Sequence, residues 1–491
     1  MTTSVNGSGS ISSAGLGSGL DVSGIVSGLM AVEQRPLNLL KNQATALSTR
    51  LSTVGKLQAY FADLQTKANA LTSPTLWSST IADSSDSSAV KVSTGSNAVA
   101  GSYSVAVSRL AVGQTVTSST LANSSATLSA GSLTIELGSY DSAANPPVSF
   151  TPKSGSTAVT LTIGSADTSL AALRDKINAA GAGVTASIVS DASGARLSLR
   201  SKDTGAENAF RISATETVDD GNPASGLSAL AFDATDIGSP MTRSTSAGNA
   251  ALTVNGIALS SASNTLNNVV DGLTLNLVKT TGSNDAEVTV TTDTASVKTA
   301  IASFATSFNT LAAFIQSQTA YNADSKVAGN LQGDQATLSL QNQLRSVLNQ
   351  GSSASATWSR LSEIGLTLKT DGTLNTDATR LDNALGNLGE LKKLLTADGS
   401  SAADSGFVRR FKRLADAALG SDGMLQSRTE SIKASVTRNS QSQDAMQHRL
   451  SQTEARLRAQ YSSLDTKMAS LNNLSTYMSQ QITQYNRSGS A

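Results

Sequence analysis

The chain has 491 residues, enough for about three or four domains, and contains no cysteine, which excludes disulfides, thiolate metal sites and cysteine nucleophiles. Lys plus Arg equals Asp plus Glu at 36 each, so no net field draws the chain to nucleic acid or to an anionic membrane. The single histidine, His448, lies beside an apolar helical seam and is interpreted as a solvated position. With no HExxH, P-loop or GxSxG site supported by a partner histidine, we expect no cofactor, no metal and no enzymatic activity.

Residues 1–35 combine a Ser/Gly-rich start with a short apolar segment. Residues 1–13 show neither the basic nor the apolar region of a secretory signal, and residues 14–30 carry Asp21 and five glycines, too interrupted to span a membrane. The alternating glycines at 15–19 suggest a dinucleotide loop only superficially, because no βαβ unit surrounds them. We expect a short helix with Asp21 as its N-cap, ordered by a partner. The candidate contact residues are Leu20, Val22, Ile25, Leu29 and Met30.

A first long helix is predicted over 36–73, with Pro36 at its first position and Pro74 closing it. Its apolar residues recur at steps of three and four, the spacing of a coiled coil. A core helix of a globular domain is the alternative, which the length argues against. The predicted seam residues are Leu40, Leu47, Leu51, Val54, Phe61 and Leu64.

A β region follows the first helix. Alternation predicts strands at 89–93 and 101–111, and later at 252–254, 273–278 and 287–291. Residues 121–240 add strands, predicted at 133–137, 159–163 and 196–200. They also contain one short helix, predicted at 169–178 and ended by Gly181. All seven prolines fall at or before residue 240, so the architecture changes beyond that point.

Helix resumes near residue 295 and supplies a third seam, with Ile301, Phe304, Phe308 and Leu311 at steps of three and four. Residues 331–350 and 376–396 are also predicted to be helical. Between them, the dipeptide Asp371-Gly372 predicts a hairpin that joins short strands at 364–368 and 373–374.

The C-terminal helix is predicted over 424–486, and no glycine or proline interrupts it. At 1.5 Å per residue it reaches roughly 90 Å, far beyond what residues 36–73 can cover. Its last turns therefore need an external partner. Two successive four-residue steps, from Thr453 to Leu457 to Tyr461, form a stutter, which marks either the change to partner contacts or a harmless irregularity. The candidate contact residues are Leu464, Met468, Leu471, Leu474, Met478 and Ile482.

The order helix, β, helix predicts an α+β multidomain chain with a terminal coiled-coil helical stalk and a nested two-domain β-rich head. We place its boundaries to within about ten residues. The N-terminal contact segment is 1–35, and the stalk is 36–76 with 296–445. The inner β domain is 77–120 with 241–295, and the outer β domain inserted into it is 121–240. The C-terminal contact helix is 446–491.

Several stretches, taken in order, resemble one known family. The opening GLGSGLDVSGIVSGLM at 15–30 is followed by similar motifs at 101–114, 264–277, 331–334, 364–374 and 464–468. Residues 167–212 resemble a repeat that this family shares with flagellins. On these motifs the chain resembles the bacterial flagellar filament cap proteins, the hook-associated protein 2 family. The outer domain at 121–240 varies most in such proteins, so least carries over to it.

The resemblance implies a homo-oligomeric ring, expected to be a pentamer, at the distal filament tip outside the cell. The implied partners are flagellin, the hook–filament junction protein, the export chaperone and the type III export apparatus, through which the unfolded chain leaves without a cleaved signal peptide. The implied mechanism is steric: the ring retains exported flagellin while it folds and inserts.

Two alternatives stay open at this point. One is a hook–filament junction protein or a flagellin, which share helical ends and a β head but lack the opening motif. The other is a surface adhesin whose exposed head binds host glycans, although the two tryptophans, Trp77 and Trp358, lie far apart in the sequence and form no aromatic cluster.

Overall fold

The computed structural model describes residues 21–141, 143–324 and 326–488. These residues form two compact units. Unit 1 contains the chain up to Leu76 and from Thr294 onward, and unit 2 contains Trp77–Asp293. The predicted fold class is confirmed: helices from both ends of the chain pack together in unit 1, and a β-rich region is inserted between them.

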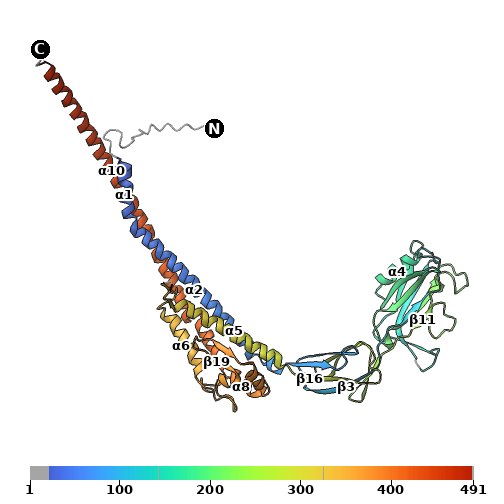
Figure 1. Cartoon of the computed structure of the whole chain (residues 1–491). Helices are drawn as coiled ribbons and strands as arrows, with labels where there is room; N and C mark the ends of the chain where they lie inside the picture. Colours follow the sequence, from blue (N-terminus) through green and yellow to red (C-terminus); the bar gives the residue numbers. More distant parts are fainter. Residues whose placement is uncertain (1–20, 142, 325, 489–491) are drawn as a thin grey trace. The chain divides into compact units, whose positions relative to one another are not determined.

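Unit 1 is built around the predicted first long helix, α2 (Arg35–Thr72). It packs along α5 (Thr294–Thr319), α9 (Phe407–Leu419) and the first part of α10 (Met424–Ser488) (Figure 1). Of the predicted seam residues, most are buried, namely Val54, Phe61, Leu64, Ile301, Phe304, Phe308 and Leu311. The three nearest the N-terminal end, Leu40, Leu47 and Leu51, are only half-buried because fewer helices surround α2 there.

Smaller elements complete unit 1. The described helices are α1 (Val22–Glu33), α3 (Pro74–Ser78, at the junction with unit 2), α6 (Gln335–Asn349), α7 (Ala378–Leu385) and α8 (Leu388–Thr396). Two short hairpins are formed by β17 (Tyr321–Asn322) with β18 (Val327–Ala328), and by β19 (Leu366–Leu368) with β20 (Leu374–Thr376).

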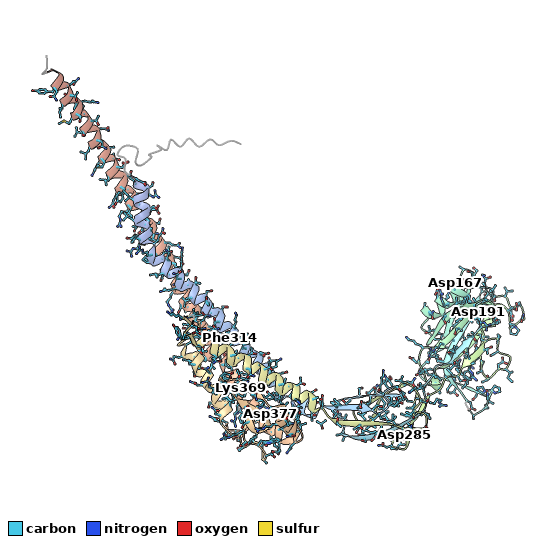
Figure 2. All side chains as sticks on the ribbon, in the orientation of Figure 1. Asp167, Asp191, Asp285, Phe314, Lys369 and Asp377 are labelled. Atoms are coloured by element: carbon cyan, nitrogen blue, oxygen red, sulfur yellow. The ribbon has the colours of Figure 1, made fainter. Side chains whose placement is uncertain are left out.

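The predicted Asp-Gly hairpin is confirmed in the second of these. The N–H of Lys369 donates to the carbonyl of Thr373 at 2.8 Å, and Gly372 takes a φ of +83° in the turn. Lys369 is labelled in Figure 2. The first strand begins at Leu366 and not at residue 364, because Gly365, with φ +90°, ends a 3-10 turn there.

Two helix predictions in unit 1 need correction. The stretch 376–396 is two helices, because α7 ends at Leu385, with Gly386 as its C-cap. The Asn387 side chain then caps α8 by accepting from the N–H of Glu390 at 3.4 Å. Helix α9 was not predicted, although its buried face includes Phe407 and Phe411 at a four-residue step. The ring of Phe411 lies 5.5 Å from those of both Phe304 and Phe308, so α9 closes the core formed by α5.

One part of unit 2 consists of two antiparallel sheets around a shared apolar cluster that includes Val105, Leu252 and Leu275. The first sheet has the order β1 (Thr80–Ser84), β16 (Ala286–Thr292), β3 (Gly101–Arg109), β12 (Ala250–Val254) and β13 (Ile257–Ser261). The second has the order β14 (Thr265–Val270), β15 (Leu273–Leu277) and β2 (Val90–Thr94).

The other part of unit 2 packs two further sheets and α4 (Leu170–Ala179) around a separate cluster that includes Leu133, Leu173, Leu197 and Phe210. Ser169 caps α4, accepting from the N–H of Ala172 at 3.2 Å, which confirms the predicted start. One sheet contains β5 (Gly131–Tyr140), β6 (Phe150–Pro152), β7 (Val159–Ile163) and β10 (Ala209–Glu216). The other contains β4 (Thr115–Thr117), β8 (Val184–Asp191), β9 (Gly194–Ser201) and β11 (Thr242–Thr245).

The strand pairings bear on where the inserted domain begins. Strands β4 and β11 pair with each other, and β4 also pairs with β9. Both β4 and β11 fall in the predicted inner domain, whereas β9 falls in the predicted outer one. A division that keeps each sheet whole runs just before Thr115 and just after Thr245. The nested arrangement itself stays a prediction.

Candidate partner-binding surface of the terminal helices

The short helix α1 begins as expected from the sequence. The Asp21 carboxylate accepts from the N–H of Gly24 at 2.8 Å, which confirms this residue as the N-cap. The face of α1 that carries Val22, Val26 and Met30 is buried in a cluster with Leu37 and Leu450. This face of α1 therefore packs against α10 of its own chain (Figure 1).

The candidate contact residues of α1 divide between its two faces. Val22 and Met30 lie in the contact with α10, whereas Ile25 and Leu29 are exposed. Val32 of α1 and Leu39, near the start of α2, are exposed as well. Leu20 lies outside the described residues. Val26, which was not among the candidates, is buried with Val22, a four-residue step that places both on one helical face.

The first part of α10 is covered by other helices of unit 1. Leu425 and Ile432 are buried, and polar contacts fix the register with α2. The Gln58 amide donates to the Thr429 hydroxyl at 3.3 Å, and the amide of buried Asn439 donates to Gln43 at 3.4 Å. Further along, Leu450 is 7% exposed, and Leu457 and Tyr461 are half-buried against the α1 cluster.

Beyond Tyr461 the apolar side chains of α10 lose this cover. Leu464 is 43% exposed and Leu471 is 59% exposed, in contrast to Leu450. This rise in exposure begins just after the stutter at 453–461. It agrees with the interpretation that the stutter marks the change from contacts within the chain to contacts with a partner. We call the exposed candidate residues the C-terminal stripe: Leu464, Met468, Leu471, Leu474, Met478 and Ile482. Tyr477 and Tyr485 are exposed beside it.

The C-terminal stripe is an exposed apolar surface on α10. Fully burying one Leu, Ile or Met side chain contributes about 1.5–3 kcal/mol. The six side chains are 38–59% exposed, so burying the part that remains accessible would favour association with a partner.

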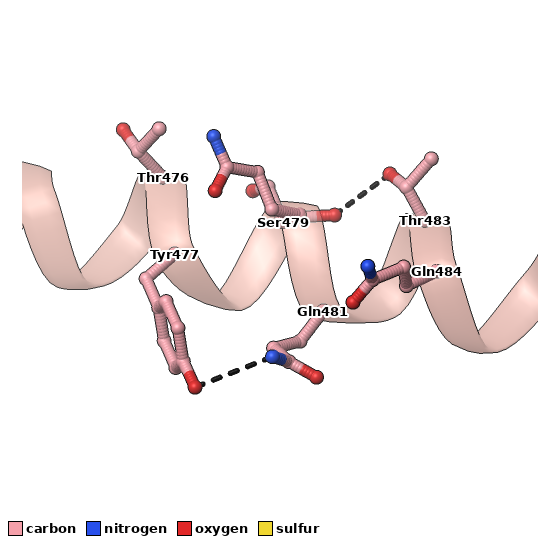
Figure 3. Close-up of a pocket in the computed structure, with 7 residues that line it drawn as sticks. Thr476, Tyr477, Ser479, Gln481, Thr483 and Gln484 are labelled. Carbon is pink, nitrogen blue, oxygen red and sulfur yellow. Dashed lines mark hydrogen bonds between the residues drawn. The ribbon is translucent and has the colours of Figure 1, made fainter.

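A shallow hollow lies among polar side chains of the same helix (Figure 3). The Gln481 amide donates to the Tyr477 hydroxyl at 3.2 Å, and the Thr483 hydroxyl donates to the carbonyl of Ser479 at 2.7 Å. All of its lining residues belong to α10. One helix cannot enclose a small molecule, so we interpret the hollow as an ordinary groove between neighbouring side chains of α10.

The described residues were also compared with the requirements of a metal site and of a membrane-spanning helix. In the part of the chain that the structure describes, no three His, Cys, Asp or Glu side chains are grouped so that they could hold a metal ion. None of the described helices combines the length and the apolar character that a membrane span needs. His448 is exposed on α10.

Comparison with known families finds matches at both ends of the chain. Residues 18–114 match the family described as Flagellar hook-associated protein 2 N-terminus, and residues 247–473 match Flagellar hook-associated protein 2 C-terminus. Residues 149–203 match the Flagellin hook IN motif, which overlaps the stretch at 167–212 that resembles flagellins.

Two similar relatives cover nearly the whole chain. The flagellar hook-associated protein 2 of Escherichia coli (strain K12) is 33% identical over 96% of this chain and 98% of its own length. The protein of that name from Salmonella typhimurium is 31% identical over 98% of this chain and 100% of its own length. Among solved structures, the D1-D2-D3 domains of the E. coli flagellar cap protein FliD superpose with a TM-score of 0.58 at 32% identity, covering 78% of this chain and 99% of that one.

Proposed function

Because the chain belongs to the flagellar hook-associated protein 2 family, we propose that it caps the growing flagellar filament. In this role it sits at the distal tip, outside the cell, retains exported flagellin and promotes its folding and insertion. The observation that carries the proposal is the C-terminal stripe, six apolar residues of α10 that the described residues of the chain leave exposed. The role is structural and needs no catalytic group.

The stripe gives the cap a means of attachment. A filament is an array of subunits, and an apolar helix face gains most where neighbouring helices can bury it. We propose that residues 446–491, together with the outer face of α1 at Ile25 and Leu29, insert among the subunits at the tip. Val22 and Met30 then hold α1 on α10, so that the two helices enter as one body.

The cap works as a homo-oligomer, for which we propose a pentameric ring held by the stalk and the β domains. Its further partners are flagellin, the hook–filament junction protein, and the chaperone and type III apparatus that export the chain unfolded. The absence of cysteine supports this route, since no disulfide can form before export. The proposed stalk is 36–76 with 296–445, and the inserted β domain lies within 77–295.

The proposal is tested by Leu471→Asp, which places a carboxylate in the centre of the stripe. Burying it at the tip without compensation costs several kcal/mol or forces its protonation. In the isolated chain, where Leu471 is exposed, the same change costs about 0.5 kcal/mol. We expect the purified variant to melt almost normally, while cells shed caps and leak unpolymerised flagellin into the medium.

Asn473→Asp is the matched control. It adds the same charge to an exposed position two residues away, on the other side of α10. This variant should grow filaments of normal length and retain flagellin. Full filaments with no flagellin in the medium in Leu471→Asp cells would exclude anchoring by the stripe. Unfolding of the purified Leu471→Asp protein would assign the stripe to the chain's own core.

A further inference from the structure

Unit 2 contains a polar cavity of about 500 Å³ that the capping function does not use. Its volume falls within the range of small-molecule pockets. Residues from several strand ends line it. Arg109 ends β3, Tyr140 ends β5, and Arg243 lies within β11. Gln114 and Asn249 come from the two segments that connect the apolar clusters of unit 2.

Backbone hydrogen bonds hold the walls of this cavity in place. Val112 and Gly248 exchange a pair of bonds, at 2.9 and 3.0 Å. The N–H of Gly205 donates to Val112 at 3.2 Å, and the N–H of Ala206 donates to the Asn249 side chain at 2.7 Å. The cavity is therefore formed before any ligand enters, which lowers the entropic cost of binding.

Positive charge dominates the lining. Arg109 Nε donates to the carbonyl of Asn249 at 3.0 Å, which orients the guanidinium, and Arg109 forms no ion pair with any described residue. The Arg243 guanidinium lies 5.9 Å from the centroid of the Tyr140 ring and likewise has no ion-pair partner among the described residues. Asp141, whose carboxylate accepts from the N–H of Ala143 at 2.9 Å, is the one carboxylate among the described residues of the lining.

A buried amide lies behind one wall of the cavity. Gln114 is fully buried, and its Nε2 donates to the carbonyl of Phe210 at 2.7 Å. Its Oε1 accepts no hydrogen bond from a described residue. Because the residue is fully buried and Oε1 has almost no accessible surface, this amide packs behind the wall of the cavity and does not contact a ligand.

We propose that this cavity binds a small hydroxylated oxyanion, namely a sugar carboxylate or a sugar phosphate. Arginine presents a planar fork of N–H donors that matches carboxylate and phosphate oxygens. Arg109 and Arg243 bind the oxyanion, and the hydroxyl groups of the sugar pair with accessible polar groups of the wall, among them Asn249 and Ser260.

Calorimetric titration of the full-length chain tests this with glucuronate, glucose 6-phosphate and neutral glucose. We expect at least one charged sugar to bind and glucose not to bind. If only glucuronate binds, the arginines recognise a carboxylate. If only glucose 6-phosphate binds, they recognise a phosphate. Arg109→Gln and Arg243→Gln should each weaken binding at least about tenfold, the scale of one charge-assisted hydrogen bond.

Two further variants separate a binding role from a folding role. Arg200→Gln removes an exposed arginine of β9 that does not line the cavity, and it should leave binding unchanged. Asp141→Asn removes the opposing negative charge and should tighten binding on the order of threefold, a gain that misfolding cannot produce. Failure of both charged sugars to bind, equal binding of glucose, or equal loss in Arg200→Gln would overturn the proposal.

Discussion

At the scale of single residues, the Asp334 carboxylate joins two helices of unit 1. It caps α6, accepting from the N–H of Thr337 at 3.0 Å, and lies 2.6 Å from Nε of Arg428 on α10. The contact with Arg428 is a close ion pair and not an aligned hydrogen bond, since that Nε makes none with a described residue. The carboxylate is almost fully buried, whereas Arg428 is about one-third exposed.

We predict that Asp334→Asn lowers the free energy of unfolding by about 2 kcal/mol. The amide still caps the helix but leaves Arg428 without its counter-charge, in a site that is only partly buried. Asp334→Ala also removes the cap, at about 1 kcal/mol more. Urea titration of the purified variants measures both values.

The control is Asp377→Asn, because Asp377 also caps a helix but its side chain is 44% exposed (Figure 2). Its ion pair with Arg380 is a surface pair, so the expected loss is below about 0.5 kcal/mol. Equal losses in Asp334→Asn and Asp377→Asn would show that burial of the ion pair contributes nothing.

At the scale of elements, α9 supplies aromatic residues to the core of unit 1. Phe411 is fully buried between Phe304 and Phe308 of α5. We predict that Phe411→Ala destabilises the chain by about 3–5 kcal/mol, through lost apolar contact and the cavity left behind. Thermal or urea unfolding of unit 1, followed by helical circular dichroism, measures the loss.

Phe314→Ala provides the comparison on α5 itself. Phe314, which Figure 2 labels, is half-buried, and its ring centroid lies 4.9 Å from that of Tyr60. We expect a loss of about 1 kcal/mol there, the size of one aromatic pair. If the two alanine variants were equally stable, α9 would not be part of the cooperative core.

At the scale of the whole molecule, the inserted part of unit 2 should be removable. Val112 and Gly248 are paired, so the chain leaves and re-enters the first pair of sheets at neighbouring positions. We predict that replacing residues 115–245 with a short Gly/Ser linker keeps the remaining sheets folded, because their apolar cluster contains no residue from the deleted range. Calorimetry should still show their cooperative transition.

A second deletion with different boundaries tests where the inserted part begins and ends. A deletion of 123–240 leaves β4 and β11 behind without β9, their sheet neighbour. That variant should aggregate more readily, because it exposes unpaired strand edges. Equal behaviour of the two deletions would contradict the boundary drawn from the sheets, and loss of the transition in both would refute the insertion.

Local patterns in the sequence were sufficient for much of the fold. The seams of α2, α5 and α10 follow from apolar residues at steps of three and four, and Asp21, Ser169 and the Asp-Gly turn act on residues within a few positions of themselves. Helix α9 carries the same kind of signal, with Phe407, Phe411, Ala415 and Ala418 on one face, and could have been predicted. The ordered motifs likewise indicated the family, since each motif is a run of consecutive residues.

Only the tertiary structure decided which apolar faces are covered. Val22 and Leu471 both lie on apolar helical faces, yet the first is buried against α10 and the second is exposed. Periodicity shows that a helix has an apolar face, but the occupant of that face comes from residues distant in the sequence. The same holds for the pairing of β4 with β9, and for the cavity that brings together Arg109 and Arg243. These arrangements depend on chain reversals that no local pattern specifies.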